Sequence, residues 1–358
     1  MSGPEEQGHA NGYPLWRMST GNRQSTIGNP DPAEVIVWTD GPRCALVAAA
    51  LDLMGNAVTV RGVGGPRVAE VDELARRLSC VREDDLRKLV VDHHDAAYLV
   101  VADGAFEDVA DVAAAAEAGV VVLELEPVAA DADALALVRE PRGGRRIELE
   151  PVPAFMEGPG WTSAADPREP LGAPHTLVID HVGRTDELTL FARLLDAWRT
   201  VLRFVPMPQS VDAQLSVPPD RSPGRAPRNP RGITGSITAH ARIDAKAAVV
   251  LHVSDQAAAA RRRLHVLGAG GELLVRDTDY ALYDRAGALI DEHRPKLRQE
   301  SVADLIAHHW RRVMERPPGP PTVAPTAAAE ALACCQACLL SARTGAPEDP
   351  RKLMALGR

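Results

Sequence analysis

Residues 35–51, VIVWTDGPRCALVAAAL, decide the fold of this 358-residue chain. A buried apolar strand over 35–39 runs into a short turn, and an Ala-rich helix follows directly. Gly55 ends that helix, and a second apolar strand over 57–63 completes a βαβ unit of about thirty residues. This unit predicts a parallel sheet with helices packed on its faces.

The same alternation of strands and helices continues to residue 152. Helices are expected over 66–80, 83–91, 106–119 and 131–140, and strands over 96–103, 120–128 and 146–152. Continuous Val/Leu strands between helices are typical of a parallel sheet that is buried on both faces and doubly wound. We therefore expect an α/β protein whose Rossmann-like domain spans 33–152, after a disordered tail over 1–32.

Ligands of such sheets bind beyond the carboxyl ends of the strands, where a dinucleotide fingerprint places three glycines. Those three places hold Thr39, Gly41 and Cys44, so two of them carry a Cβ where a pyrophosphate would come close. Arg61 stands at the expected end of the second strand, where it would pair with the 2′-phosphate of NADP rather than with the ribose hydroxyl of NAD. NAD and NADP both stay open as cofactors, and so does the absence of any dinucleotide. The candidate cofactor-binding residues are Thr39, Asp40, Gly41, Arg43, Arg61, Asp103 and Pro127.

A second domain is expected over 153–350. A Pro/Gly-rich crossover over 153–174 leads into a strand over 175–182 and an amphipathic helix over 187–205. Further strands are expected over 211–217, 235–243, 247–255, 262–277 and 280–291. Several of them alternate apolar and polar residues, which predicts an α+β domain with a largely antiparallel open sheet. The Pro/Arg-rich loop over 218–232 is expected to be flexible and exposed to solvent.

Composition excludes several classes of function. A net charge of −9 argues against nucleic acid as the principal partner, and no apolar run is long enough to span a membrane. Five cysteines, an odd number, fit a reducing compartment, and a cytoplasmic location is expected. Cys334 and Cys338 share a helical face but lack two further ligands at zinc-site spacing, so we expect buried thiols and no metal.

Two stretches resemble the Gfo/Idh/MocA oxidoreductases, relatives of glucose-fructose oxidoreductase and inositol dehydrogenase. Residues 113–129, AAAAEAGVVVLELEPVA, resemble the helix and strand that lead into Glu-Lys-Pro in that family, with Leu125, Glu126 and Pro127 at those three places. The hairpins over 262–292 and the closing helix, which ends in SARTG at 341–345, resemble the family's second domain. The resemblance implies an NAD(P)-dependent dehydrogenase of a sugar, inositol or similar polyol. Glu126 reverses the charge of the family's lysine, which binds cofactor or substrate.

The family's catalytic motif, Asp-x-Gly-x-His-x-x-Asp, can be placed in two ways. At 180–187, Arg184 takes the place of the histidine; in the next helix, Asp196 takes that place and Arg199 takes that of the aspartate. We favour the second placement because 175–182 is typical of a strand. Both lack the imidazole, and an arginine accepts no proton below about pH 12. The candidate catalytic residues are Glu126, Asp196 and Arg199, whereas His181 is expected to be structural.

Three hypotheses for function follow. The first is a protein with weakened or lost dehydrogenase activity that acts as a ligand-binding or partner subunit, with a sugar-like small molecule as its ligand. The second is an active NAD(P)-dependent dehydrogenase that uses Arg43 or Arg61 for phosphate and Asp196 as its base. The third is a non-enzymatic scaffold. In each case we expect a homo-oligomer formed through the second domain's sheet.

Overall fold

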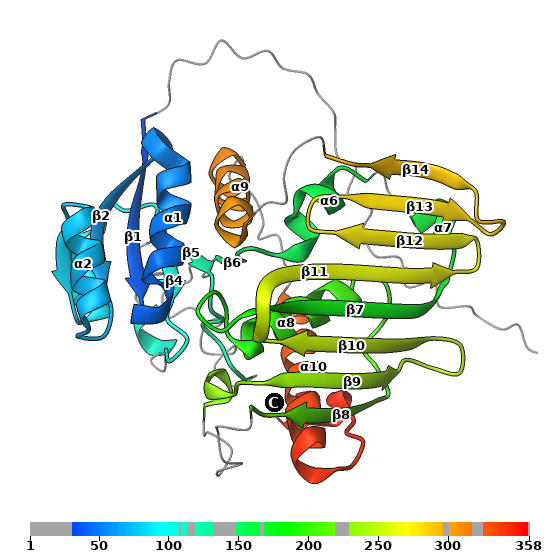
Figure 1. The fold of residues 1–358 in the computed structure, drawn as a ribbon. Coiled ribbons are helices and arrows are strands. Elements are labelled where there is room, and N and C mark those ends of the chain that lie inside the picture. The colour runs from blue at the N-terminus through cyan, green and yellow to red at the C-terminus, as the bar shows by residue number, and fades with distance from the viewer. Residues whose placement is uncertain are drawn as a thin grey trace, which may run out of the picture. The chain divides into compact units, whose positions relative to one another are not determined.

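The computed structural model describes residues 31–106, 109–112, 119–131, 148–164, 168–218, 229–295, 301–316 and 325–356. The expected tail, the helix expected over 131–140 and most of the helix expected over 106–119 lie outside these ranges. The chain from Pro32 onward forms one compact unit built on two sheets (Figure 1). None of the described helices is long and apolar enough to cross a membrane.

The first sheet, sheet A, has six parallel strands in the order β3-β2-β1-β4-β5-β6. The strands are β1 Ala33–Thr39, β2 Val58–Gly64, β3 Val81–Glu83, β4 Tyr98–Ala102, β5 Val121–Glu124 and β6 Leu149–Pro151. This is the strand order of a Rossmann-type sheet, and its order reverses between β1 and β4. The predicted parallel α/β sheet is confirmed.

Strand β5 is shorter than predicted. It ends at Glu124 rather than at 128, because the Glu124 carboxylate accepts a hydrogen bond from the Val128 N–H at 2.9 Å and the chain turns there. Glu126 and Pro127 therefore lie in a turn beyond the strand, at the edge where ligands of this fold bind.

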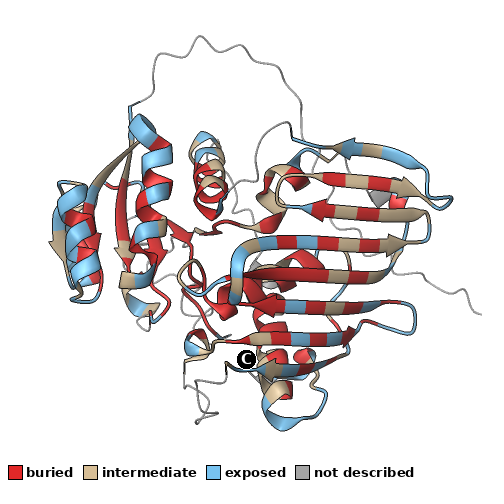
Figure 2. Cartoon of the chain, in the orientation of Figure 1, coloured by how far each residue is buried: buried red, intermediate tan, exposed pale blue. Residues whose placement is uncertain are grey.

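Helices cover both faces of sheet A. The helices are α1 Cys44–Met54 and α2 Ala69–Arg77 on one face, and α3 Leu86–Asp92 on the other. Alternate β1 residues enter different cores: Val35 and Val37 pack with α1 and α2, whereas Ile36 packs with α3. Figure 2 shows that most residues of β1 and β4 are buried, and the two cores on either side of β1 confirm the doubly wound arrangement.

The second sheet, sheet B, has eight strands in the order β14-β13-β12-β11-β7-β10-β9-β8. The strands are β7 Pro174–Arg184, β8 Ser210–Ser216, β9 Ser236–Arg242, β10 Ala248–Ser254, β11 Gln256–Gly268, β12 Gly271–Arg276, β13 Tyr280–Asp284 and β14 Leu289–His293. Only the β7–β10 pairing is parallel, so the expected antiparallel character is confirmed. Strand β11 begins at Gln256, before the expected 262. A bulge between Gln256 and Arg261 interrupts the alternation of apolar and polar residues there.

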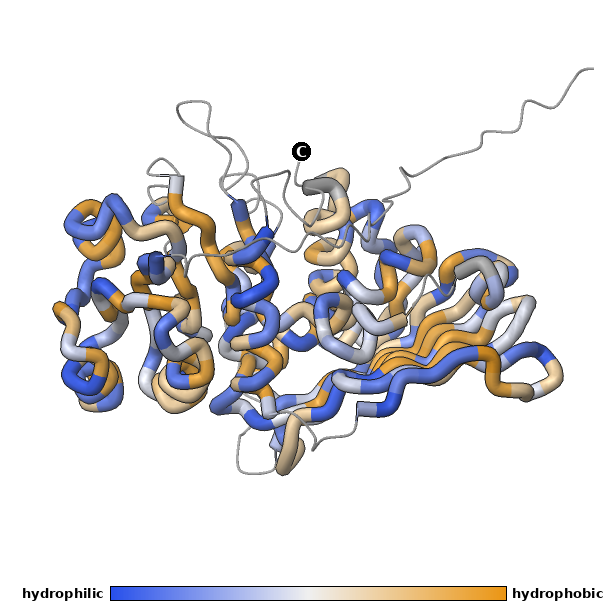
Figure 3. Tube along the Cα trace, turned by 90° about the horizontal axis from the view of Figure 1, so that it is seen from above, coloured by the Kyte–Doolittle hydropathy of each residue, from blue (hydrophilic) through white to orange (hydrophobic). Residues whose placement is uncertain are grey.

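The helices of this half are α6 Pro159–Thr162, α7 Arg168–Leu171, α8 Leu190–Val201, α10 Pro325–Thr344 and α11 Pro350–Leu356. Helices α8 and α10 pack against one face of sheet B, which Figure 3 shows from above. Cys334, Cys335 and Cys338 are buried free thiols in this core, and the indole N–H of Trp198 donates to the Cys338 Sγ at 3.3 Å. The predicted burial of these thiols is confirmed.

Helix α9, Val302–Glu315, returns to sheet A and packs against α1. Its Ile306 and Trp310 are fully buried in the same core as Val47. The domain boundary expected at 152/153 assigns this helix to the second domain, so the sequence did not predict that it packs on the first sheet. Residues from both halves of the chain therefore stabilise the first sheet.

Candidate functional site

The 3₁₀ turn Gly41–Arg43, which leads into helix α1, is capped by the protein's own carboxylate. Asp40 follows β1, and its Oδ1 accepts a hydrogen bond from the Arg43 N–H at 3.1 Å. Its Oδ2 accepts one from the Gly104 N–H, beyond β4, at 2.9 Å. Pro42 has no N–H to offer. In dinucleotide-binding sheets the free N–H groups at this helix start bind the pyrophosphate, whereas here an internal anion takes that position.

Arg43 and Glu126 form a buried ion pair above the strand ends. The Arg43 Nε donates to the Glu126 Oε1 at 2.7 Å, and the side chains are 5% and 0% exposed. The Arg43 Nη1 pairs with Asp40, and Nη2 donates to the Thr185 carbonyl at 3.4 Å. Burial lowers the pKa of Arg43, but Glu126 and Asp40 outweigh it and leave that pKa raised. The guanidinium is therefore permanently charged and fully partnered.

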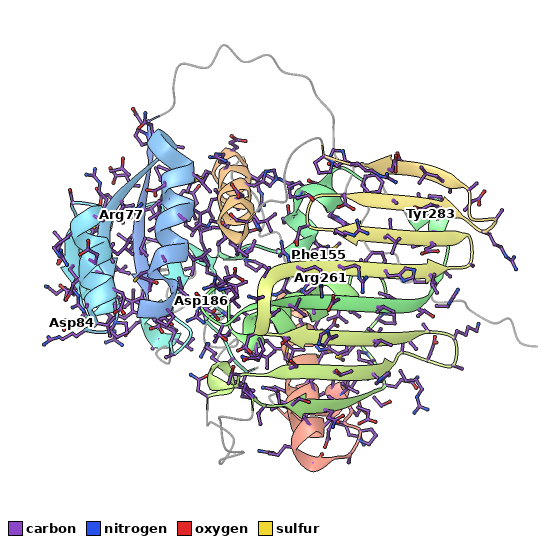
Figure 4. All side chains as sticks on the ribbon, viewed as in Figure 1. Arg77, Asp84, Phe155, Asp186, Arg261 and Tyr283 are labelled. Atoms are coloured by element: carbon purple, nitrogen blue, oxygen red, sulfur yellow. The ribbon has the colours of Figure 1, made fainter. Side chains whose placement is uncertain are left out.

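Helix α8 fixes the other side of Glu126. The Thr189 N–H donates to Glu126 Oε1 at 2.8 Å, and the Thr189 hydroxyl donates to Oε2 at 2.6 Å. The same hydroxyl accepts from the Ala192 N–H as the N-cap of α8. Asp186 lies in the turn before this helix (labelled in Figure 4). Glu126 thus links the crevice of sheet A to sheet B's helical layer.

The Arg43 guanidinium occupies the crevice between β1 and β4. A Cβ added at Gly104 would lie 2.8 Å from Nη1 and Nη2 of Arg43, so the guanidinium lies directly on the Gly104 backbone. Asp103 borders the crevice and accepts from the Trp38 indole N–H at 3.2 Å and the Ala105 N–H at 2.8 Å. Burial raises the pKa of Asp103. Together with Asp40 and Glu126, it makes this edge rich in carboxylates.

Of the other predicted cofactor-binding residues, Thr39 and Gly41 flank Asp40 at the crevice, whereas Arg61 lies elsewhere. Thr39 is fully buried and its hydroxyl donates to the Ala102 carbonyl at 3.4 Å, while Gly41 lies beside the Glu70 carboxylate. The placement of Arg61 at the end of the second strand is wrong. Because β2 continues to Gly64, Arg61 lies within the strand, where it is exposed and pairs with Glu34 near the start of β1.

The loop expected to be flexible and solvated over 218–232 contains a buried arginine, which corrects that expectation for its described end, 229–232. Arg231 is 5% exposed, and its guanidinium donates to three carbonyl oxygens. These acceptors are Phe106 O at 2.6 Å, Pro127 O at 2.7 Å and Val128 O. Arg231 thereby fixes the turns that follow β4 and β5 against sheet B's half of the unit.

A small cavity lies beside the turn that contains Glu126, and two of the three predicted catalytic residues line it. Its volume is about 30 Å³, and Asp196 and Arg199 of α8 line it together with Pro127. Glu126 is not among its lining residues, because its side chain faces Arg43 and Thr189. Asp196 accepts from the Phe155 N–H at 3.1 Å and from the Arg262 Nη1 at 3.3 Å, and burial raises its pKa.

The structure adds two site residues that sequence reasoning missed or set aside. His181 is fully buried in the cavity wall, with its Nδ1 3.6 Å from Asp196 Oδ2 and its ring edge-on to Phe155. Burial, aided by the positive charge of Arg262, lowers the pKa of His181 to about 3. Arg262 donates to Asp277 at 2.6 Å and to the Pro153 carbonyl at 2.7 Å. The alternation along the strand could have indicated that Arg262 is buried, because Arg262 lies on the same inward face as Leu264.

The placement of the catalytic motif at 180–187 is not supported by this geometry. His181 and Gly183 lie within β7, Arg184 is exposed and pairs with Asp186, and Glu187 pairs with Arg193. In the described residues, no three His, Cys, Asp or Glu side chains gather as a metal-binding group.

The fold is that of two-domain dehydrogenases. No protein-family model and no curated protein matches the sequence. Levoglucosan dehydrogenase in complex with NADH and L-sorbose shares the fold with a TM-score of 0.69 at 14% identity, over 89% of this chain and 99% of that one. GenD2 from gentamicin A biosynthesis in complex with NAD gives a TM-score of 0.66 at 18% identity, over 92% and 99%.

An oxidoreductase from Agrobacterium radiobacter in complex with NAD⁺, L-tartaric acid and magnesium gives a TM-score of 0.64 at 13% identity, over 90% of this chain and 99% of that one. These neighbours are dehydrogenases and oxidoreductases of the Gfo/Idh/MocA type, the family that the sequence resembles. At this level of identity the likeness shows the fold, and the particular activity rests on the site residues.

Proposed function

We propose that this protein keeps the dehydrogenase fold but has lost hydride transfer, and that it acts as a ligand-binding or partner subunit. The observation that carries the proposal is the buried Arg43–Glu126 pair in the crevice of sheet A. The alternative is an active NAD-type dehydrogenase, which the bound NAD and NADH of the neighbours favour.

The residues of the crevice do not fit a dinucleotide bound in the usual way. A pyrophosphate needs free N–H groups and positive potential at the helix start. Asp40 already accepts the Arg43 N–H and the Gly104 N–H, and Pro42 contributes no donor. The charge of Arg43 is held by two carboxylates, so a pyrophosphate would have to displace a buried carboxylate before it could bind this guanidinium.

The proton acceptor is also altered. Hydride removal from an alcohol needs a base that takes the hydroxyl proton, and removing a positioned base costs about 10²- to 10⁴-fold in rate. In the placement of the motif that we favour, Asp196 takes the place of the family's histidine, and it is engaged by the Phe155 N–H and Arg262. His181 lies close by, but its low pKa of about 3 makes it a poor base at neutral pH.

Titration with NADH and NADPH tests the proposal. At a cofactor concentration of about 100 Kd, binding would stabilise the native state by about 2.7 kcal/mol and raise the melting temperature by several degrees. We expect neither a melting shift nor a change in nicotinamide fluorescence at millimolar cofactor. A clear shift with either cofactor, or oxidation of a polyol by the protein, would overturn the proposal in favour of the active dehydrogenase.

A pair of variants tests whether the crevice residues cause the exclusion. Asp40→Gly/Glu126→Gln removes both carboxylates that hold Arg43 and leaves its guanidinium free for a pyrophosphate, and we expect this variant to gain measurable NADH binding. Arg61→Ala removes an exposed arginine of the same sheet and serves as the matched control, with no gain expected. A double variant that folds but still binds no NADH would show that the crevice residues do not cause the exclusion.

A further inference from the structure

Several buried side-chain nitrogens that make no hydrogen bond belong to residues that line the small cavity described above. In the described part of the chain, both ring nitrogens of His181, the Nε of Arg193 and of Arg199, and the Nη2 of Arg262 are buried and make no hydrogen bond. All four residues line the same cavity. The nearest acidic atom to His181 Nδ1 in an ion-pair contact is Asp196 Oδ2, at 3.6 Å. Elsewhere in the described residues, buried side-chain nitrogens without a hydrogen bond belong to Arg82, His265, His308 and Trp310, one atom each, and none of these residues lines the cavity. The nitrogens of Arg82 and His265 lie in ion pairs with Asp72 and Glu272.

A cluster of buried nitrogens without hydrogen bonds is energetically unfavourable unless a bound group pairs with them. A buried donor without a partner costs about 1–3 kcal/mol, more when charged, and native structures hold few of them. The cavity of about 30 Å³ has room for about two water molecules, or for the two oxygen atoms of one carboxylate group. Donors are in excess there, so the missing occupant is an acceptor.

The acidic side chains of the cavity are already hydrogen-bonded within the protein. Glu124 accepts from the Val128 N–H at 2.9 Å and from the Arg199 Nη2 at 3.5 Å. Asp196 accepts from the Phe155 N–H and from Arg262 Nη1, and burial favours its neutral form. The Nε of Arg199 and the Nη2 of Arg262 make no hydrogen bond with these carboxylates.

We propose that this cavity binds the carboxylate group of a small organic acid, held by Arg199, Arg262 and the His181 N–H. The inference rests on the proposed function, since it names the ligand class of the pocket that the chain retains. Arginine donors match a carboxylate geometrically, and hydrogen bonds to an ionised acceptor are about twice as strong as neutral ones. Leu125, Val152 and Leu188 supply apolar walls that limit the competing contact with water.

The experiment compares acetate with acetamide, its neutral isostere, at pH 7.5, with chloride keeping the ionic strength constant. Affinity is measured from the melting temperature, and the imidazole signals of His181 are followed by NMR. We expect acetate and formate to stabilise the wild type and to shift the His181 signals, whereas acetamide does neither. If neither acid acts, or if acetamide acts equally well, the cavity holds water or a neutral group and the proposal is wrong.

Single-residue variants test which side chains bind acetate. Arg199→Gln is expected to weaken acetate binding at least tenfold, and Arg203→Gln, the same change one turn further along at an exposed position, is expected to leave it unchanged. His181→Phe provides a second site variant if Arg199→Gln does not fold. Equal affinity in Arg199→Gln and Arg203→Gln would overturn the assignment.

The two proposals fail separately because no nucleotide is present in this experiment. NADH binding by the wild type would overturn the loss of hydride transfer while leaving a carboxylate site in place. Insensitivity to acetate and formate would remove the carboxylate site while leaving the closed crevice.

Discussion

Arg43 and Glu126 lie 83 positions apart and meet as a buried pair. Removing one partner leaves the other charge buried, so Glu126→Ala should lower the free energy of unfolding by about 3–5 kcal/mol. The double variant Arg43→Met/Glu126→Ala should cost less than the sum of the two single changes, because the charges disappear together. Urea unfolding of all four proteins measures this coupling.

An exposed ion pair supplies the control for that cycle. Arg77 and Asp52 are 51% and 56% exposed, so Arg77→Ala should change the free energy of unfolding by no more than about 1 kcal/mol. A similar loss for Arg77→Ala and Glu126→Ala would contradict the importance assigned to the crevice pair.

His181 makes stability depend on pH. Its pKa is about 3 in the native state, whereas an unfolded histidine has one near 6.5. Between these values the unfolded state binds the extra proton, so stability is lost as the pH falls below about 6.5. From pH 7.5 to pH 5.0 this histidine should lower the free energy of unfolding by about 2 kcal/mol.

His181→Phe should remove that contribution. The drop in the free energy of unfolding between pH 7.5 and pH 5.0 should be smaller in the variant than in the wild type. His252→Gln, which changes a half-exposed histidine on the outer face of sheet B, should leave the wild-type drop unchanged. Equal drops in the wild type and in His181→Phe would show that His181 is not buried in its neutral form.

Among the elements, helix α9 has a complete capping box. The Ser301 hydroxyl accepts from the Asp304 N–H at 3.2 Å, and the Asp304 carboxylate accepts from the Ser301 N–H at 2.9 Å. Ser301→Ala should lower the free energy of unfolding by about 1 kcal/mol. Ser163→Ala, at an exposed position without a side-chain cap, should change it by less than about 0.5 kcal/mol in the same thermal or urea assay.

The predicted elements matched the structure where a local period was strong. Strand β1 and helix α1 lie within a few residues of their predicted bounds, because their apolar positions repeat clearly. Strand β3 was not predicted, since its three residues are too few to show a period. The end of β5 depends on a side-chain hydrogen bond to Val128, which periodicity cannot report.

At the scale of the whole molecule, we propose that copies pair through the outer face of sheet B. This face is turned towards the viewer in Figure 1, opposite α8 and α10. Val178 and Val250 are partners in neighbouring strands there and remain only partly buried. A second copy that covered these side chains would remove their remaining apolar surface from water.

Sedimentation velocity at micromolar concentration tests that pairing. We expect the wild type to sediment as an oligomer and Val250→Glu to shift it towards the monomer, because a charge would be buried in the interface. Val217→Glu, at a 41% exposed position beyond the end of β8, is the control and should leave the oligomer intact. A monomeric wild type would contradict the proposal.

The sequence by itself determined the two sheets and most of their strands and helices, and it carries the prediction that the glycine and histidine positions of the motifs are altered. These features are local, since a few consecutive residues set the period, the turn chemistry and the presence of a Cβ. Only the tertiary structure decided that Arg43 lies against Glu126, that Arg231 is buried, and that His181 and Arg262 share a cavity with Asp196. Those contacts join segments far apart in the chain, and they depend on strand order and helix packing, which no short stretch of sequence encodes.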